Sequence, residues 1–181
     1  AHGLADDMLT TTILASKAPK LIAPAMNTAM YENPVVQDNI RKLQTYGYEV
    51  ITPASGYLAC GDTGAGKMPE PDTLLQYIYR TCAYEKDMTG MKVLITAGPT
   101  QEAIDPVRYI TNHSSGKMGY NLARACMLRG ADVTLVTGKT SLTPPLFVET
   151  IPVVTACDMY EAVTERSADM DLIIKAAAVA D

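Results

Sequence analysis

The sequence predicts an α/β protein with two Rossmann-like parallel-sheet domains, both incomplete in this chain. Apolar runs of strand length alternate with amphipathic stretches of helix length over residues 21–52 and again over 92–179. A polar stretch separates the two alternations. We therefore predict a first domain over 1–84, a linker over 85–90 and a second domain over 91–181. The chain starts inside a helical pattern and stops directly after an apolar run, so we expect both domains to be incomplete.

Composition narrows the class of protein. With 181 residues, of which 48% are hydrophobic, the chain can bury a substantial core. Its net charge of -5 argues against non-specific binding of nucleic acid, and no apolar run reaches the roughly 18 residues of a membrane span. The cysteines are widely spaced, which favours reduced thiols and a cytoplasmic setting over disulfides or zinc. They are Cys60, Cys82, Cys126 and Cys157.

The first element is a predicted helix over residues 4–17. Its apolar residues Leu4, Met8, Ile13 and Leu14 are spaced so that they can share an inward side. We expect this helix to cover a sheet.

A strand, a helix and a second strand follow. The strand is short and apolar, over residues 21–23, and Pro34 stands at the first turn of a helix over 35–46. Gly47 closes this helix, and residues 48–52 are again typical of a strand. Strands joined through a helix predict a parallel sheet.

Asn27 follows the first of these strands, where ligands bind in parallel sheets. Its amide group can donate to a carboxylate and accept from an amine, which suits a small polar substrate. An Asx turn that only stabilises the loop explains the same residue equally directly. Spacing alone leaves both interpretations open.

Residues 53–71 are the least regular part of the chain, with four glycines and three prolines among nineteen residues. This composition predicts a mobile flap rather than a packed element. Cys60 lies inside it beside Gly61, and an exposed thiol can donate a proton or react, although a lone cysteine in a loop is often incidental. A helix over 72–84 follows, with Cys82 facing the core.

The second domain opens with KVLITAGPTQEAIDPVRYITNHSSGKMG, residues 92–119. A buried strand over 93–97 stops at Gly98, and a helix begins near Gly119 with an apolar face. Tyr120, Ala123, Cys126 and Met127 form that face. Polar residues gather between the strand and the helix start, whose free N–H groups attract anions. A phosphate site is therefore predicted here.

The rest of the domain continues the alternation. We predict strands over 132–137 and 147–154, a helix over 158–167 capped by Thr155 or by its own first residue, and a final buried strand over 172–179. Pro152 is irregular enough to indicate a sheet edge.

The segment SSGKMG is neither a GxGxxG fingerprint nor a Walker A box, so a helix start with only a packing role is an open alternative. Arg108 and Asn112 favour a binding site. If this stretch is helical, these residues share a face and can converge on one anionic substrate.

Two groups of motifs resemble known families. APAMNTAMYENP and ACGDTGAGKMPEP resemble the flavin-dependent cysteine decarboxylases that act on 4'-phosphopantothenoylcysteine. ITAGPTQEAIDPVRYITNHSSGKMG and the final AAAVAD resemble the phosphopantothenate–cysteine ligases. Their order is similar to that in the bifunctional enzymes of coenzyme A biosynthesis, of which this chain resembles the end of the first activity and the start of the second.

The first resemblance implies FMN as cofactor and decarboxylation of 4'-phosphopantothenoylcysteine to 4'-phosphopantetheine. Asn27 would hold the substrate carboxylate, Met26 would line the site and Cys60 would donate a proton to the product enethiolate. The catalytic histidine of that family would lie upstream of Ala1.

The second resemblance implies that 4'-phosphopantothenate and cysteine are joined through an acyl-cytidylate, with CTP as substrate and Mg2+ as metal, whose ligands the sequence leaves unknown. Asn112 would act on the intermediate and Arg108 would support it. A lysine-rich loop of that family would lie beyond Asp181. The residues implied in nucleotide binding are Ser114, Ser115, Gly116, Lys117, Gly119, Lys175, Ala176, Ala177 and Asp181.

The resemblance also implies a homo-oligomer with a dimeric ligase part and a trimeric decarboxylase part. Two other functions stay open from the residues: a nucleotide-dependent oxidoreductase built on the second domain, and a catalytically silent fragment that only binds nucleotide or assembles. A preference for CTP over NADPH would separate the first of these from the ligase.

Overall fold

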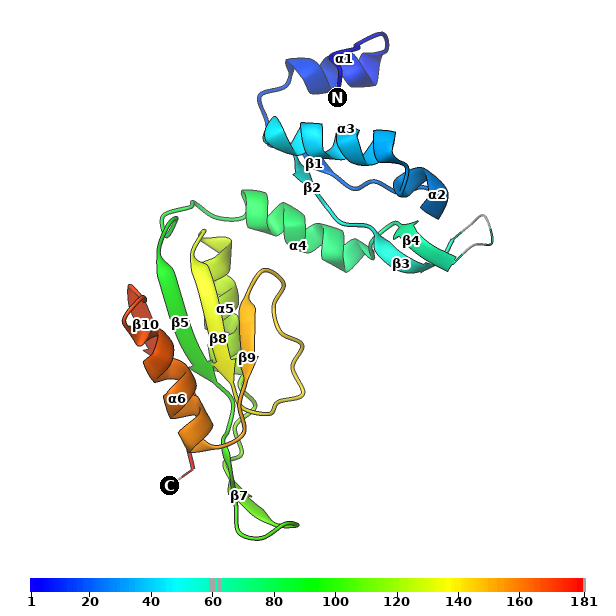
Figure 1. Cartoon of the computed structure of the whole chain (residues 1–181). Helices are drawn as coiled ribbons and strands as arrows, with labels where there is room; N and C mark the ends of the chain where they lie inside the picture. The colour runs from blue at the N-terminus through cyan, green and yellow to red at the C-terminus, as the bar shows by residue number, and fades with distance from the viewer. Residues whose placement is uncertain (59–60, 62, 181) are drawn as a thin grey trace. The chain divides into compact units, whose positions relative to one another are not determined.

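The computed structural model describes residues 1–58, 61 and 63–180 (Figure 1). The chain divides into two compact units, Ala1–Thr81 and Cys82–Asp181. Both are mixed α/β structures, and each has its own parallel strands.

The first unit contains one parallel strand pair and one antiparallel hairpin. Strand β1 pairs in parallel with β2, which confirms the predicted strand–helix–strand crossover. Strands β3 and β4 form the hairpin. The elements in order are α1 (Met8–Ala15), β1 (Leu21–Ile22), α2 (Thr28–Tyr31), α3 (Pro34–Thr45), β2 (Glu49–Val50), β3 (Ala54–Tyr57), β4 (Thr63–Lys67) and α4 (Pro71–Cys82).

Helix α1 starts later than predicted and buries no residue. Asp7 is its N-cap, and the Asp7 carboxylate accepts a hydrogen bond of 2.7 Å from the backbone N–H of Thr10. The predicted inward side is wrong, because Leu4, Met8 and Leu14 are exposed, at 80%, 87% and 58%. The three threonines in the middle of α1 interrupt any continuous apolar stripe, so the helix has no face to bury.

Helix α3 follows its sequence signals closely. Asn33 caps the N-terminus by accepting from the N–H of Val35 at 3.0 Å, and Pro34 occupies the first turn as predicted. Gly47 ends the helix with a left-handed φ of 81°.

The following segment contains a hairpin that the sequence did not predict. Within residues 53–71, β3 and β4 pair as antiparallel strands, and Gly56 and Gly66 have positive φ. The prediction that Cys82 faces the core is wrong, because Cys82 is exposed at the end of α4. Cys60 lies outside the described residues.

The second unit is built on a four-stranded parallel sheet in the order β10-β5-β8-β9. Pro152 lies in edge strand β9, as predicted. The elements are β5 (Lys92–Ala97), β6 (Gln101–Ala103), β7 (Tyr109–Thr111), α5 (Lys117–Leu128), β8 (Asp132–Thr137), β9 (Glu149–Pro152), α6 (Ala156–Ser167) and β10 (Leu172–Lys175).

The two helices of this unit cover opposite faces of the sheet. Val93, Ile95 and Leu135 pack with the buried face of α5, whereas Leu94 and Val136 pack with residues of α6. The central strands β5 and β8 are therefore buried on both faces, which explains their continuous apolar runs. All four residues predicted for the inner face of α5 are buried.

The stretch between β5 and α5 is a hairpin, β6–β7, which is drawn at the bottom of Figure 1. The condition under which Arg108 and Asn112 would share a face, a helical backbone, is therefore not met. These residues flank strand β7, and extended backbone separates them far more than one helical turn. Local antiparallel pairing determines the conformation of this segment instead of helix propensity.

Residues 85–90, predicted as a polar linker, pack onto the second unit. Met88 is buried among its core residues, Lys86 donates to the carbonyl oxygen of Leu128 at 2.5 Å, and Arg129 forms an ion pair with Asp87. The hydrogen bond from Arg129 lowers the pKa of Asp87.

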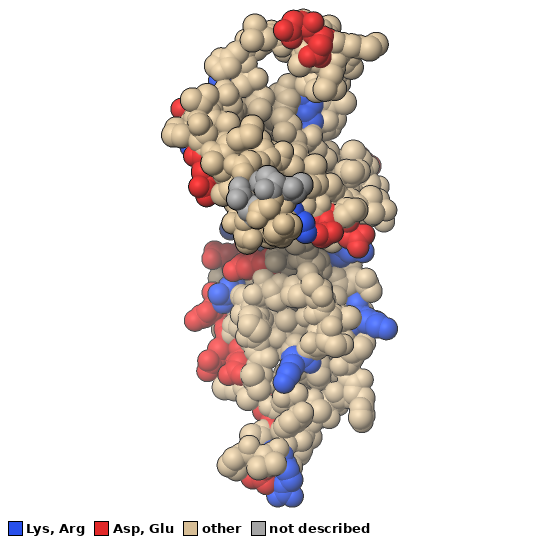
Figure 2. Space-filling model, turned by 90° about the vertical axis from the view of Figure 1, so that its right-hand side faces the viewer, with Lys and Arg blue, Asp and Glu red and all other residues tan. Residues whose placement is uncertain are grey.

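Surface charge and helix length can be described for part of the chain. On the face drawn in Figure 2, basic and acidic side chains are interspersed, and its described residues form no continuous basic area. Across the described ranges, no helix has the length and hydropathy needed to cross a bilayer.

Candidate functional site

A cavity of about 480 Å³ lies within the first unit, between the loop before α2 and the hairpin β3–β4. Met26 and Asn27, both predicted as substrate-binding residues, line it. Its other walls are mainly apolar with one basic side chain. They are formed by Ala25, Tyr57, Leu58, Gly66, Lys67 and Met68.

Backbone contact between the loop and the hairpin closes one side of this cavity. The N–H of Met26 donates to the carbonyl oxygen of Gly66 at 2.9 Å. A Cβ atom on Gly66 would lie 2.2 Å from the carbonyl oxygen of Met26, and the φ of Gly66 is 121°. Only glycine fits this position, so the hairpin can approach the loop this closely.

Asn27 is both at the cavity and at a helix start. Its side-chain oxygen accepts from the N–H of Ala29 at 2.9 Å and caps α2. The structure therefore contains the turn-stabilising role considered for this residue, and it also orients the Asn27 side chain. Next to it, the buried hydroxyl oxygen of Thr28 has no hydrogen-bond partner among the described residues.

In the second unit, three glycines bring together the loops at the carboxyl ends of β5 and β8 and the start of α5. Gly98 and Gly116 have left-handed φ values of 71° and 74°. A Cβ on Gly138 would lie 1.8 Å from the carbonyl oxygen of Pro99. These close backbone approaches form a glycine-lined edge at the end of the sheet where ligands bind in this fold class.

The predicted phosphate-binding residues lie at this edge. The hydroxyl of Ser114 accepts from the N–H of Gly116 at 3.3 Å, and that of Ser115 accepts from the N–H of Lys117 at 3.5 Å. Gly119 has a packing role, since a Cβ there would lie 2.5 Å from the Cβ of Ala97. Helix α5 therefore begins close to β5, with the exposed side chain of Lys117 in its first turn.

The segment after β10 is held by two buried threonines that the sequence analysis missed. The hydroxyl oxygen of Thr96 accepts from the N–H groups of Ala176 and Ala177, at 3.2 and 3.3 Å. Thr100 accepts from the N–H of Ala180 at 2.9 Å. A threonine at the end of an apolar strand was the available signal, because a buried hydroxyl needs a partner.

Asn112 joins this segment, whereas Arg108 does not. The Asn112 amide donates to the carbonyl oxygens of Ala178 and Val179, at 3.3 and 3.0 Å. Arg108 donates from Nε to Asp105 at 2.7 Å at the exposed tip of the hairpin. Backbone N–H groups of Val107 and Arg108, together with this guanidinium, lower the pKa of Asp105. The structure therefore brings Asn112, but not Arg108, to residues 175–180.

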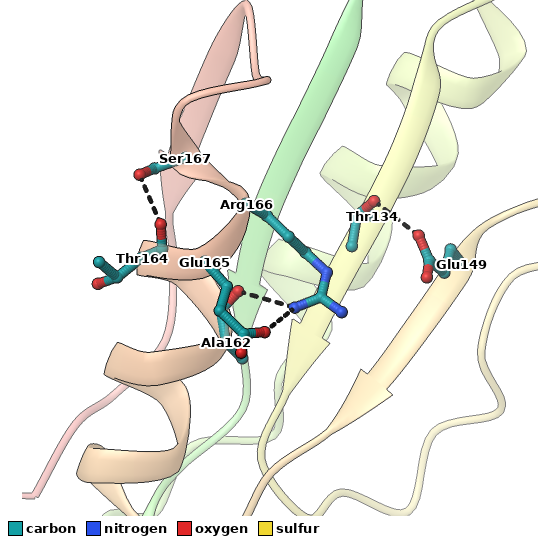
Figure 3. Close-up of polar contacts among 7 residues, drawn as sticks. All are labelled: Thr134, Glu149, Ala162, Thr164, Glu165, Arg166 and Ser167. Atoms are coloured by element: carbon teal, nitrogen blue, oxygen red, sulfur yellow. Dashed lines mark hydrogen bonds and ion pairs between the residues drawn. The ribbon is translucent and has the colours of Figure 1, made fainter.

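A second cavity, of about 430 Å³, lies between α6 and β10 and includes Lys175 and Ala177 in its lining. Asp181 lies outside the described residues. Toward the C-terminal end of α6 and on the neighbouring strands β8 and β9, several polar side chains have partners within the unit (Figure 3). Arg166 donates to Glu165 and to the carbonyl oxygen of Ala162, and Thr134 donates to Glu149 at 3.1 Å. Arg166, Thr134 and Glu149 are therefore engaged in structural contacts.

Comparison with known proteins gives the family. Residues 88–181 match the family model described as the DNA/pantothenate metabolism flavoprotein C-terminal domain, and residues 1–83 match the model described as flavoprotein. The chain belongs to the DNA/pantothenate metabolism flavoprotein family. Its relatives include the coenzyme A biosynthesis bifunctional protein CoaBC of Haemophilus influenzae, 49% identical over 179 residues. CoaBC of Bacillus subtilis is 52% identical over 184 residues.

These relatives are longer than the chain. The alignments cover 99% and 100% of this chain but 45% of each relative. A crystal structure of the C-terminal domain of a CoaBC protein aligns with a TM-score of 0.50 and 55% identity, over 52% of this chain and 48% of the other. The chain therefore spans less than half the length of its CoaBC relatives.

The described part of this flavoprotein-family chain contains no group of three or more His, Cys, Asp or Glu side chains arranged to hold a metal ion. Any Mg2+ ligands are therefore not identified by clustered side chains.

Proposed function

We propose that this chain contributes parts of two active sites to a bifunctional enzyme of coenzyme A biosynthesis. The first would decarboxylate 4'-phosphopantothenoylcysteine, and the second would join cysteine to 4'-phosphopantothenate at the expense of CTP. The observation that carries the proposal is the cavity lined by Met26 and Asn27, in a unit that matches the flavoprotein family. The second unit of the same chain matches the C-terminal domain of pantothenate-metabolism flavoproteins.

The proposed architecture is two Rossmann-like domains over 1–84 and 91–181, joined by 85–90. For the second domain, the strand order supports this. Counted along the chain, β5, β8, β9 and β10 are strands 1, 2, 3 and 4, and their spatial order is 3-2-1-4. That is the beginning of the Rossmann order, in which ligands bind beyond the carboxyl ends of the strands.

In the decarboxylase site, the walls suit a flavin with a small polar substrate beside it. Apolar side chains of Met26, Leu58 and Met68 offer a surface for a planar ring system, and Asn27 offers an oriented amide for a carboxylate. FMN would supply two-electron redox chemistry there. Cys60, in the sequence between β3 and β4, would hold the proton that is transferred to the product.

In the ligase site, the glycine-lined edge would receive the triphosphate of CTP. Ser114, Ser115, Gly116 and Lys117 surround the N-terminus of α5, where free N–H groups and the helix dipole favour phosphate. Asn112, whose amide donates to Ala178 and Val179, would act on the acyl-cytidylate there. Arg108, on the exposed hairpin, would contribute its charge to an anionic substrate. Mg2+ would accompany the triphosphate.

The experiment requires the full-length enzyme, purified from a cytoplasmic extract. Calorimetric titration with CTP, ATP and NADPH would be followed by an assay of the ligated product and of 4'-phosphopantetheine. We expect CTP to bind in preference to ATP and NADPH, and Cys60→Ser to keep the flavin spectrum while losing decarboxylation. Binding of NADPH alone would favour the oxidoreductase, and normal decarboxylation by Cys60→Ser would refute the role of that thiol.

The assembly is part of the proposal. A dimeric ligase part and a trimeric decarboxylase part would combine into one larger homo-oligomer. Sedimentation of the full-length enzyme would test this, since a monomer at working concentration contradicts it.

A further inference from the structure

Thr140 occupies a central position between the two left-handed glycines of the second unit. Its methyl carbon would lie 2.8 Å from a Cβ atom placed on either Gly98 or Gly116. These glycines belong to the loop after β5 and to the N-cap of α5. The methyl group of Thr140 therefore fills the space that side chains on both glycines would otherwise need.

The hydroxyl group of Thr140 connects the loop after β8 to the first turn of α5. It lies 3.1 Å from the phenolic oxygen of Tyr120, and it accepts from the N–H of Leu142 at 3.3 Å. Tyr120 is buried, and its phenolic oxygen also lies 3.3 Å from the hydroxyl of Thr137 at the end of β8. Thr137 in turn donates to the carbonyl oxygen of Gly138 at 2.9 Å.

These contacts hold the first turn of α5 in place, although the N-cap residue has no side chain. Gly116 is the N-cap of α5 and has no side chain, so the N-cap residue itself makes no capping hydrogen bond. The hydroxyls of Ser114 and Ser115 accept only from the N–H groups of Gly116 and Lys117, at 3.3 and 3.5 Å. Tyr120 is the fourth residue of the helix, and its side chain ties the first turn to the loop after β8. The hydroxyl chain Thr140–Tyr120–Thr137 thus links the end of β8 and the loop after it to the first turn of α5.

We propose that Thr140 is a positioning residue for nucleotide binding, which acts through Tyr120 by fixing the start of α5 relative to the glycine-lined edge. This inference rests on the proposed function, in which that helix start receives the phosphates of CTP. The N–H groups of a helix start bind an anion best when they are held in place before the ligand arrives. Thr140 itself makes no contact with the nucleotide in this proposal.

The test compares three substitutions in the full-length enzyme. Thr140→Val keeps the methyl packing against Gly98 and Gly116 but removes the hydroxyl, Thr140→Ser keeps the hydroxyl but removes the methyl, and Tyr120→Phe removes the phenolic oxygen. We expect Thr140→Val and Tyr120→Phe to raise the KM for CTP about fivefold, the loss of one neutral hydrogen bond. Thr140→Ser should stay near the wild-type value, and decarboxylation should not change in any variant.

Two outcomes would overturn this inference and leave the proposed function intact. The first is an unchanged KM for CTP, with wild-type ligation, in Thr140→Val. The second is equal impairment of Thr140→Ser and Thr140→Val, which would assign the effect to the methyl group. If Thr140→Val does not fold, an unchanged KM in Tyr120→Phe overturns the inference by itself. A wild-type enzyme without any CTP-dependent ligation overturns the proposed function, and the assignment to CTP with it.

Discussion

The two units of this chain differ in how much of their apolar surface is buried. In the second, Val93, Leu94 and Ile95 are fully buried, because helices cover both faces of the central strands. In the first, apolar residues of α1 such as Met8 are largely exposed, and helices α1–α4 contain no buried residue. The difference teaches that the second unit has its own core, whereas the first is organised by close backbone contacts around its cavity.

The largest expected difference in the free energy of unfolding is between two variants, each of which shortens one leucine in one unit. Leu94→Ala removes a fully buried side chain between the sheet and α6, and it should lower the free energy of unfolding by about 2–5 kcal/mol. Leu14→Ala removes an exposed side chain and should change it by less than about 0.5 kcal/mol. Urea denaturation followed by circular dichroism measures both. Equal losses would contradict the contrast between the units.

A second comparison uses the glycine of closest approach in each site. Gly66→Ala would push the hairpin away from the carbonyl oxygen of Met26, and Gly138→Ala would push the loop after β8 away from Pro99. In the full-length enzyme, the first should reduce decarboxylation and the second CTP-dependent ligation, each by about a hundredfold, as expected for a displacement near 1 Å.

Each glycine variant serves as the control for the other. If the sites are independent, Gly66→Ala should leave ligation, and Gly138→Ala should leave decarboxylation, within about twofold of wild type. A loss of both activities in either variant would mean that the substitution unfolds the chain or that the sites are coupled. Gly47→Ala serves as a third variant, since a Cβ there meets no atom within 4 Å and tests only the left-handed backbone.

The same contrast explains which elements could be predicted from the sequence. Strands β5 and β8 and the buried face of α5 followed directly from apolar runs and helical spacing, because burial on both faces leaves little alternative. The inward side of α1 was predicted from the same kind of spacing and was wrong. Apolar spacing was not sufficient there, because three consecutive threonines interrupt the apolar side of α1.

Hairpins were the elements that sequence patterns missed. Glycine-rich β3–β4 looked like an irregular flap, and β6–β7 looked like a polar loop, because both hairpins lack the alternating apolar residues from which a strand is predicted. For the sites, motifs indicated Met26 and Asn27, which line one cavity. Thr96 and Tyr120 were missed as polar contacts, since their hydroxyl groups have partners far away in the sequence.

A third comparison replaces one threonine hydroxyl in each unit. Thr96→Val removes the hydroxyl that accepts from Ala177, whereas the N–H of Ala176 keeps the carbonyl oxygen of Thr96 as an acceptor at 3.2 Å. The variant should lower the free energy of unfolding by about 1–3 kcal/mol. Thr28→Val removes a buried hydroxyl that has no partner among the described residues, and it should leave stability unchanged or raise it slightly. Thermal unfolding of both variants would decide this. A large loss in Thr28→Val would reveal a partner for that hydroxyl.

The smallest expected effect is that of low pH on the N-termini of α1 and α6. Asp7 of α1 and Asp158 of α6 each belong to a capping box, and backbone hydrogen bonds, from Thr10 to Asp7 and from Thr155 to Asp158, lower both pKa values below 3.8. A lowered pKa means that the folded state favours the carboxylate. Its stabilisation is therefore present above the unfolded pKa and is lost as the pH falls through the lowered folded pKa.

Both helix starts should consequently loosen as the pH falls through the lowered pKa values, and by a similar small amount, since both carboxylates are exposed and screened by solvent. Carbon-detected NMR titration of the two carboxyl groups measures their pKa values directly. In Asp158→Asn, which can still cap α6 but cannot titrate, the acid-dependent change at α6 should disappear while that at α1 persists. A pKa at or above 3.8 for either group would contradict the cap geometry. Acid should thus affect the two units alike, although their cores differ, because a helix cap depends on local contacts and not on burial.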